Sequence, residues 1–272
     1  MDCLKNVIKF YINSSIHVAL SVYCFLKITE LYFDFSCSEA LSYFVFYGTI
    51  VAYNFIKYAE IAKFHHRSLT KNLRLIQLFS FACLVPFCYY FTHLKIKTIV
   101  FIIPFALITL LYAVPFLGGF QKNLRSISYL KILIVSLVWS AITVLLPVYD
   151  FGVERVNSIT LFLMILQRFL FVFVLILPFD IRDMNFDIIS LQTIPKKIGI
   201  KKTKKVGFLV LAKCLVLEFL ISENLGFSKV FLVVFFLTLS LLMRASEDQS
   251  PFYSSLGVEA IPIIWWGLLI IL

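Results

Sequence analysis

Residues 158–187 read SITLFLMILQRFLFVFVLILPFDIRDMNFD. Up to Phe179 this stretch carries one charged side chain, Arg168, and it then ends in three aspartates: Asp180, Asp183 and Asp187. An apolar run of about 20 residues is long enough to cross a bilayer as an α-helix. The run is continuous rather than alternating, which indicates a helix and not a strand of a membrane barrel. The stretch therefore predicts a membrane-spanning helix with a cluster of acids at one end.

Similar apolar runs recur along the whole chain. Of its 272 residues, 61% are hydrophobic and 15% are charged, and the mean hydropathy is +0.95. A single soluble core cannot bury so much apolar surface. We therefore expect an all-α, polytopic membrane protein with about nine spanning helices in one transmembrane domain, residues 1–272. The predicted spans are 8–29, 37–56, 73–92, 98–117, 127–149, 158–180, 205–222, 227–243 and 252–272.

Positive charge is distributed unevenly between the two sets of predicted loops. The chain has 25 Lys and Arg against 15 Asp and Glu, a formal charge of +10. With the N-terminus inside, the outer loops hold only Lys27, Lys95, Lys97, Arg155 and Lys229. Cytoplasmic loops of membrane proteins are enriched in Lys and Arg. We therefore expect a bacterial inner-membrane protein with a cytoplasmic N-terminus and an external C-terminus, and no nucleic-acid partner.

The three aspartates after the sixth span are spaced i, i+3 and i+7. On a continuous helix these positions lie within about 60° of one another, whereas Arg182 is expected to point elsewhere. Like charges on one face repel, and a divalent cation would compensate them. Hard Mg²⁺ prefers carboxylate oxygens and often shares its coordination shell with substrate phosphates. The spacing therefore suggests a Mg²⁺ site, while a solvated helix end with incidental acids stays open.

The sequence after the aspartates carries a more specific resemblance. Residues 190–199 read SLQTIPKKIG. Asp-x-x-Asp-x-x-x-Asp, followed by Thr-Ile-Pro, a Gly and a basic helix start, resembles the second aspartate motif of the UbiA-type intramembrane prenyltransferase superfamily. That family has nine transmembrane helices and cytoplasmic aspartate-rich loops after helices two and six. The family's stretch between helices four and five is similar to Tyr112-Ala113-Val114-Pro115, followed here by Lys122, Arg125 and Lys131.

The resemblance implies a fold, a reaction and a site. It implies a UbiA-like bundle that transfers a prenyl group from an allylic prenyl diphosphate to an aromatic, quinone-precursor or lipid acceptor. It implies Mg²⁺ held by Asp180, Asp183 and Asp187, of which the last two match the family's metal aspartates most closely. The implied catalytic residues are Asp183, Asp187 and Asn54. The implied substrate-binding residues are Arg67, Lys122, Arg125, Tyr112 and Lys131.

The family's first aspartate motif is degenerate in this chain. Asn54 and Arg67 match it, but its aspartate positions hold Phe55, Tyr58 and Ala62. Half of the expected metal site is therefore missing. One interpretation is that cations of the following loop hold the diphosphate directly, in place of metal; another is an ordinary positive inner loop. The cations concerned are Lys57, Lys63, His65, His66 and Arg67.

Two charges inside predicted spans leave further interpretations open. Arg168 and Glu259 either line a functional chamber or form structural pairs within the membrane. A non-catalytic relative that binds lipid or prenyl groups on a UbiA-like scaffold would fit the degenerate motif. A transporter of a hydrophobic anion would fit charges near the middle of the membrane.

Overall fold

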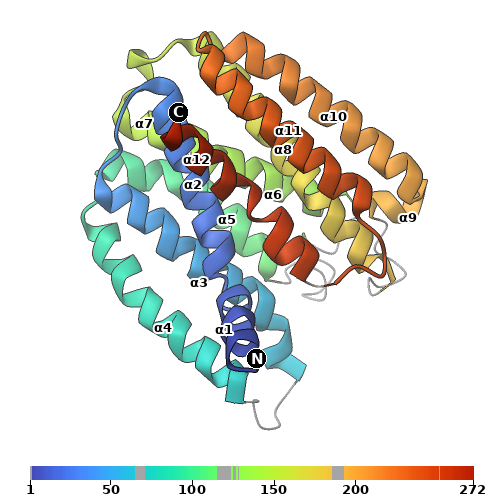
Figure 1. Ribbon diagram of the computed structural model, residues 1–272. Helices are drawn as coiled ribbons and strands as arrows, with labels where there is room; N and C mark the ends of the chain where they lie inside the picture. The colour runs from blue at the N-terminus through green and yellow to red at the C-terminus, as the bar shows by residue number, and fades with distance from the viewer. Residues whose placement is uncertain are drawn as a thin grey trace.

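The computed structural model describes residues 2–64, 71–114, 124, 127, 129–185, 193–250 and 252–272, and within these residues it contains helices and no strand (Figure 1). The first half holds α1 (Asp2–Asn13), α2 (Ile16–Phe33), α3 (Glu39–Phe64), α4 (Lys71–Thr92) and α5 (Ile96–Ala113). The second half holds α6 (Leu130–Ser140), η2 (Ala141–Leu145), α7 (Leu146–Phe151), η3 (Val153–Arg155), α8 (Ser158–Arg182), η4 (Asp183–Asn185), α9 (Ile194–Ile198), α10 (Ile200–Ile221), α11 (Leu225–Arg244), η5 (Tyr253–Val258) and α12 (Ile261–Ile271).

The helices have the length and composition of membrane spans. Within the described residues, seven helical segments are long and apolar enough to cross a membrane. The prediction of an all-α, polytopic membrane fold is thereby confirmed. The long helices α3 and α10 are not among the seven, so the count of nine spans stays a prediction.

The first predicted span is interrupted. We expected one helix over residues 8–29, but α1 ends at Asn13 and α2 begins at Ile16. Ser15 lies between them with a left-handed backbone, at φ 63°. The prediction of a continuous helix is wrong here because serine side chains compete for backbone hydrogen bonds, and because a residue of α3 binds both serines at the break.

That residue is Asn54, which is buried. Its side-chain oxygen accepts a hydrogen bond from Ser15 Oγ at 2.8 Å, and its amide nitrogen donates to the Ser14 carbonyl at 3.0 Å. The same nitrogen donates to Ser80 Oγ of α4 at 2.7 Å. Asn54 therefore joins the α1–α2 break to α3 and α4.

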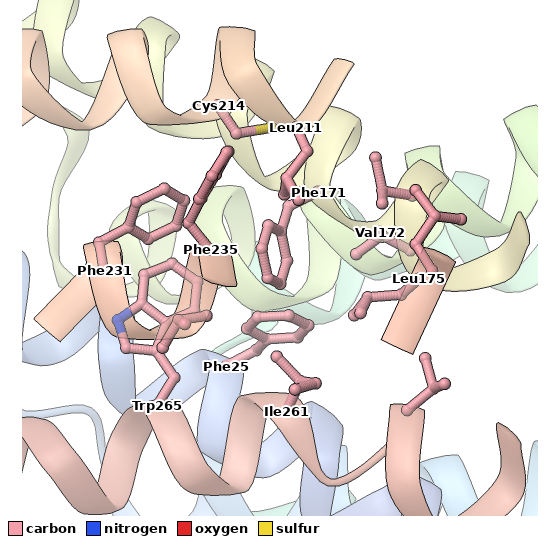
Figure 2. Packing of buried hydrophobic residues seen from close by; sticks show 14 of the residues in the cluster. Phe25, Phe171, Val172, Leu175, Leu211, Cys214, Phe231, Phe235, Ile261 and Trp265 are labelled. Carbon is pink, nitrogen blue, oxygen red and sulfur yellow. The ribbon is translucent and has the colours of Figure 1, made fainter. Parts of the chain in front are cut away.

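The main core is an aromatic cluster between α2, α8, α11 and α12 (Figure 2). The Phe25 ring meets the rings of Phe171 and Trp265 edge-on, with both centroid distances 6.1 Å and both interplanar angles 85°. Trp265 also contacts Phe231 of α11, at 5.0 Å between centroids. Edge-to-face contacts of this kind are the favoured geometry of buried aromatic rings. They join segments that lie far apart in the sequence.

Arg168 lies against this cluster and takes part in a polar network. Its Nη1 donates to the Phe25 carbonyl at 2.9 Å, and its guanidinium carbon lies 4.1 Å from the centre of the Phe25 ring. Glu218 of α10 accepts hydrogen bonds from Tyr32 at 2.6 Å and Gln167 at 2.8 Å. In the described part of the chain Arg168 has no carboxylate partner, and its Nε and Nη2 have no hydrogen-bond partner. The structure therefore places Arg168 in the core, where it contacts Phe25 but forms no ion pair with a described residue.

The faces of α4 and α5 that point away from the bundle are apolar and exposed. Only 11% of the apolar window of α4 and 17% of that of α5 is buried within the protein. Leu78 and Phe81 of α4 and Val100 of α5 are among the exposed side chains. In a membrane these two helices would face lipid, since apolar surface on this scale is unfavourable in water.

Candidate active site

A cavity of about 340 Å³ lies among the long helices. Its walls come from α2, α3, α5, α6, α8 and the η5–α12 segment. Half of its lining residues are polar or charged and half are apolar. The polar and charged ones are Ser21, Tyr53, Lys57, Thr109, Tyr112, Lys131, Arg182, Asp183, Ser255 and Glu259.

Arg182 and Asp183 form the charged rim of the cavity at the end of α8. Arg182 Nε donates to Asp183 Oδ1 at 2.7 Å, and its Nη2 donates to Asp183 Oδ2 at 3.1 Å. Its Nη1 reaches Ser255 Oγ of η5 at 3.4 Å. The expectation that Arg182 points away from the aspartates is wrong, because α8 ends at this residue and Asp183 begins a 3₁₀ turn. For the same reason, Asp180 and Asp183 do not lie on one continuous α-helix.

Lys131 and Asp180 form a second ion pair beside the rim. Lys131 Nζ lies 2.8 Å from Asp180 Oδ1. Asp180 is 2% exposed and does not line the cavity, whereas Lys131 does. An acid that loses its contact with water needs such a partner. The structure therefore places Asp180 behind the cavity wall, where its carboxylate holds Lys131 in position.

On α3, Lys57 lines the cavity together with Tyr53 and Ile56, whereas Asn54 does not. Lys57 lies one helical turn beyond Asn54, and its Nζ donates to Ser15 Oγ at 3.0 Å. Asn54 is 3% exposed and its polar atoms are bound by Ser14, Ser15 and Ser80. The stretch that resembles the family's first motif thus brings a cation to the cavity, although Lys57 is not at one of the motif's aspartate positions.

Beyond the charged rim the cavity is apolar. Val138, Val172 and Leu175 line it, and the last two also belong to the core cluster, to the right in Figure 2. A second, almost wholly apolar cavity of about 380 Å³ shares part of its wall. The residues that line both cavities are Tyr53, Ile56, Thr109, Val138 and Trp139. The two cavities are therefore neighbours, and the apolar one adjoins the one that has the charged rim.

The acids at the rim suit a single Mg²⁺ ion that is shared with a phosphate ligand. Mg²⁺ commonly takes one or two carboxylates and leaves its remaining positions to water and substrate phosphates. Asp183 meets this need, because its carboxylate lines the cavity and is 31% exposed. In the described part of the chain, no group of three or more His, Cys, Asp or Glu side chains is placed to hold a metal. Asp187 lies outside the described residues.

The structure brings together some of the residues that the sequence singled out. Tyr112, Lys131 and Asp183 line the cavity, while Asn54 and Asp180 do not. Arg67, Lys122, Arg125 and Asp187 lie outside the described residues. Sequence reasoning gave no role to Ser255 and misplaced Arg182. No sequence motif marks Ser255 as a functional residue. The nearest signal is the intramembrane Glu259, which follows it by four residues.

Comparisons with known proteins bear on the fold. No family model and no curated protein matches the sequence. A solved structure of a digeranylgeranylglyceryl phosphate synthase is 15% identical, at a TM-score of 0.54 over 100% of this chain and 97% of that one. A UbiA homologue from Archaeoglobus fulgidus bound to GPP and Mg²⁺ is 13% identical, with a TM-score of 0.58 over 94% of this chain and 97% of that one. A UbiA homologue from Archaeoglobus fulgidus bound to DMAPP and Mg²⁺ is 14% identical, with a TM-score of 0.55 over 96% of this chain and 97% of that one.

Proposed function

We propose that this chain, which has the fold of the UbiA-type prenyltransferases, transfers a prenyl group from an allylic prenyl diphosphate to a hydrophobic acceptor. The observation that supports the proposal is the cavity itself. It combines a rim of charged side chains with apolar side chains in its wall, which matches the two parts of a prenyl diphosphate. GPP and DMAPP, the ligands of the Archaeoglobus fulgidus homologue, are donors of this class.

The diphosphate would bind at the charged rim. Lys57, Lys131 and Arg182 approach it from α3, α6 and α8, and Ser255 adds a hydroxyl from η5. Arg and Lys form short, charge-assisted hydrogen bonds to phosphate oxygens. Positive charge fixed where the leaving group gains negative charge favours breakage of the allylic C–O bond. Arg67, Lys122 and Arg125 remain proposed diphosphate contacts on the strength of the resemblance.

Mg²⁺ is the proposed cofactor. Asp183 would hold it from the cavity wall, and Asp187 is the proposed second carboxylate. When bound, the ion would neutralise the diphosphate and help it to leave. Asp180 is not part of this proposal, because it is buried behind the cavity wall, whereas Asp183 lines the cavity.

The apolar walls would hold the prenyl chain and protect the allylic cation from water. Trp139, Tyr53 and Phe179 place aromatic side chains in the wall. The faces of aromatic rings attract cations, and exclusion of water prevents hydrolysis of the reactive intermediate. The second cavity would accommodate a longer prenyl chain or the hydrophobic part of the acceptor.

The test is transfer by the purified protein in detergent or lipid. Labelled geranyl or geranylgeranyl diphosphate is incubated with Mg²⁺ and with para-hydroxybenzoate or geranylgeranylglyceryl phosphate as acceptor. We expect labelled product from the wild type, and loss of donor binding in Lys57→Met. Lys229→Met, which removes an exposed cation of α11, is the control and should behave as wild type. Absence of both donor binding and product would refute the proposal and favour a non-catalytic scaffold.

A further inference from the structure

The last helical segment places an acid in the cavity wall that has no direct partner. The Glu259 carboxylate makes no hydrogen bond or ion pair within the described part of the chain, while the backbone N–H of this residue donates to the Ser254 carbonyl at 3.2 Å. The other acids near the rim are both engaged, Asp183 by Arg182 and Asp180 by Lys131. An unpaired carboxylate among apolar walls is costly, so such a group is a candidate for function rather than for stability.

The position of Glu259 relative to the rim is informative. Ser255, which contacts Arg182 at the rim, lies four residues earlier on the same segment. Four residues correspond to about one helical turn, or about 6 Å along the axis. The segment continues from the rim into α12, whose Ile261 and Trp265 belong to the apolar core. Glu259 therefore lies between the charged rim and the apolar interior, where the first carbon of a bound prenyl chain would be.

A second unpartnered polar group lines the same cavity. The Ser21 hydroxyl of α2 is buried and has no hydrogen-bond partner in the described part of the protein. α2 and α12 pack against each other. A buried hydroxyl without a partner loses the hydrogen bonds that water would give it. A polar group on a ligand would supply what both Ser21 and Glu259 lack.

We propose that Glu259 is the base that accepts the proton of the acceptor during prenyl transfer; this inference rests on the proposed function. The allylic C–O bond breaks and its electron pair leaves with the diphosphate. A hydroxyl oxygen or an aromatic carbon of the acceptor bonds to the allylic carbon. The hydrogen that this atom carried leaves as a proton to the Glu259 carboxylate, which later releases it to water. The acceptor class is therefore a molecule with an O–H or an aromatic C–H at its reacting atom.

None of the described groups next to Glu259 is as well suited to accept the proton. The charged groups that act on its carboxylate are Lys57 of α3 and Arg182 of α8, and both are cations. The carboxylate in turn acts on the phenols of Tyr53 and Tyr11. The Tyr53 hydroxyl accepts a hydrogen bond from Trp139 Nε1 at 2.8 Å. Among these groups only the Glu259 carboxylate combines access to the cavity with a free capacity to accept a proton.

The experiment separates donor binding from turnover. Glu259→Gln keeps the shape of the side chain and removes its basicity. We expect its affinity for geranyl thiolodiphosphate, an unreactive donor analogue, to stay within about threefold of wild type, while transfer falls about 100-fold or more, the usual contribution of a general base. Glu259→Asp should recover part of the rate. Glu223→Gln, at an exposed acid between α10 and α11, should behave as wild type.

Contrary results would distinguish an error in the role of Glu259 from an error in the proposed function. Turnover of Glu259→Gln within about threefold of wild type would overturn the assignment, and so would loss of analogue binding together with turnover. A wild-type protein that neither binds the analogue nor forms product would refute the proposed function, and the role of Glu259 with it.

A second measurement uses only the wild-type protein, so that it does not depend on the folding of a variant. Dicyclohexylcarbodiimide modifies protonated carboxyl groups in apolar surroundings, and peptide mass spectrometry locates the product. At a pH low enough to protonate the Glu259 carboxyl group, we expect labelling at Glu259, and protection of Glu259 by geranyl thiolodiphosphate at the same pH. A Glu259 that is not labelled, or that is labelled equally with and without the analogue, would contradict a carboxyl group in the donor cavity.

Discussion

Single residues at the rim of the cavity are distinguished by how their charges are paired. Asp183 is held by the neighbouring Arg182, and both side chains are partly exposed. Asp180 is held by Lys131 from another helix, and its carboxylate is buried. Exposed pairs contribute little to stability, whereas removal of one partner of a buried pair is costly. The two aspartates should therefore respond differently to substitution.

For Asp183 we predict a loss of binding with little loss of stability. Asp183→Ala and Asp187→Ala should weaken Mg²⁺-dependent binding of geranyl thiolodiphosphate at least tenfold, about 1.4 kcal/mol, because each removes a proposed Mg²⁺ ligand. Titrations with and without Mg²⁺ measure this, and thermal melts measure folding. Asp248→Ala, at an exposed acid after α11, is the control. Unchanged binding together with a clear drop in melting temperature would contradict a metal role.

For Asn54 we predict the opposite pattern. Asn54→Ala would leave Ser15 Oγ, Ser80 Oγ and the Ser14 carbonyl without their shared partner. Buried polar groups left unpaired cost about 1–3 kcal/mol, so the melting temperature should fall. Donor affinity measured well below that temperature should change little. Asn13→Ala, at an exposed amide at the end of α1, should leave both properties unchanged.

That prediction for Asn54 has a clear contrary outcome. The family resemblance implies a catalytic Asn54, and such a residue would lose turnover without losing stability. A variant of normal melting temperature that no longer forms product would restore the catalytic interpretation.

Two helical elements near the cavity contain π-helical segments. Trp139, which lines both cavities, lies two residues before η2, while Ser255 and Val258 lie within η5. A π-helical turn bonds residue i to i+5, so it redirects the side chains that follow it. Such segments are frequent at functional sites. In this protein residues of η2 and η5 line the two cavities, and η5 carries Ser255 into the cavity wall shortly before Glu259.

The polar network of Glu218 joins three helices, and it should be structural. Tyr32→Phe removes the hydroxyl that donates to Glu218 at 2.6 Å. Hydrogen bonds to charged groups contribute about 1.5–3 kcal/mol, and measured values within membranes are often nearer 1 kcal/mol. We therefore expect a lower melting temperature with donor binding unchanged, as measured by thermal melts and analogue titration. Tyr89→Phe, at a 59% exposed tyrosine of α4, should leave stability unchanged.

An unaltered melting temperature in Tyr32→Phe would show that Glu218 finds another donor, or water, in the membrane. Loss of donor binding at normal stability would instead connect the network to the cavity.

The molecule as a whole has an asymmetric distribution of charge and termini at opposite ends of the bundle (Figure 1). The positive-inside rule predicts that the loops after α3 and before α10 face the cytoplasm. We expect single cysteines at positions 66 and 198 to react with a membrane-impermeant thiol reagent only after the inner face is opened. A cysteine at position 223 should react from outside and serves as the control. Labelling of position 66 or 198 from the outer face alone would reverse the proposed orientation.

The sequence alone was sufficient to predict the fold class. Long apolar runs cross a membrane as helices because lipid offers the backbone no other hydrogen-bonding partner. The pattern after the sixth span then pointed to the UbiA-type fold, which the comparison of structures confirms. Hydrophobicity and motif order are local properties of the chain, so they can be recognised without coordinates.

Only the tertiary structure decided which charged residues line the cavity. Arg168 and Glu259 both interrupt apolar runs, yet the first contacts Phe25 in the core and the second lines the cavity wall. Lys57 reaches the cavity while Asn54, one turn away, binds the break between α1 and α2. These differences depend on contacts between residues that are far apart in the sequence, such as Ser15 with Asn54. Spacing along one helix cannot specify them, because the partner lies on another helix.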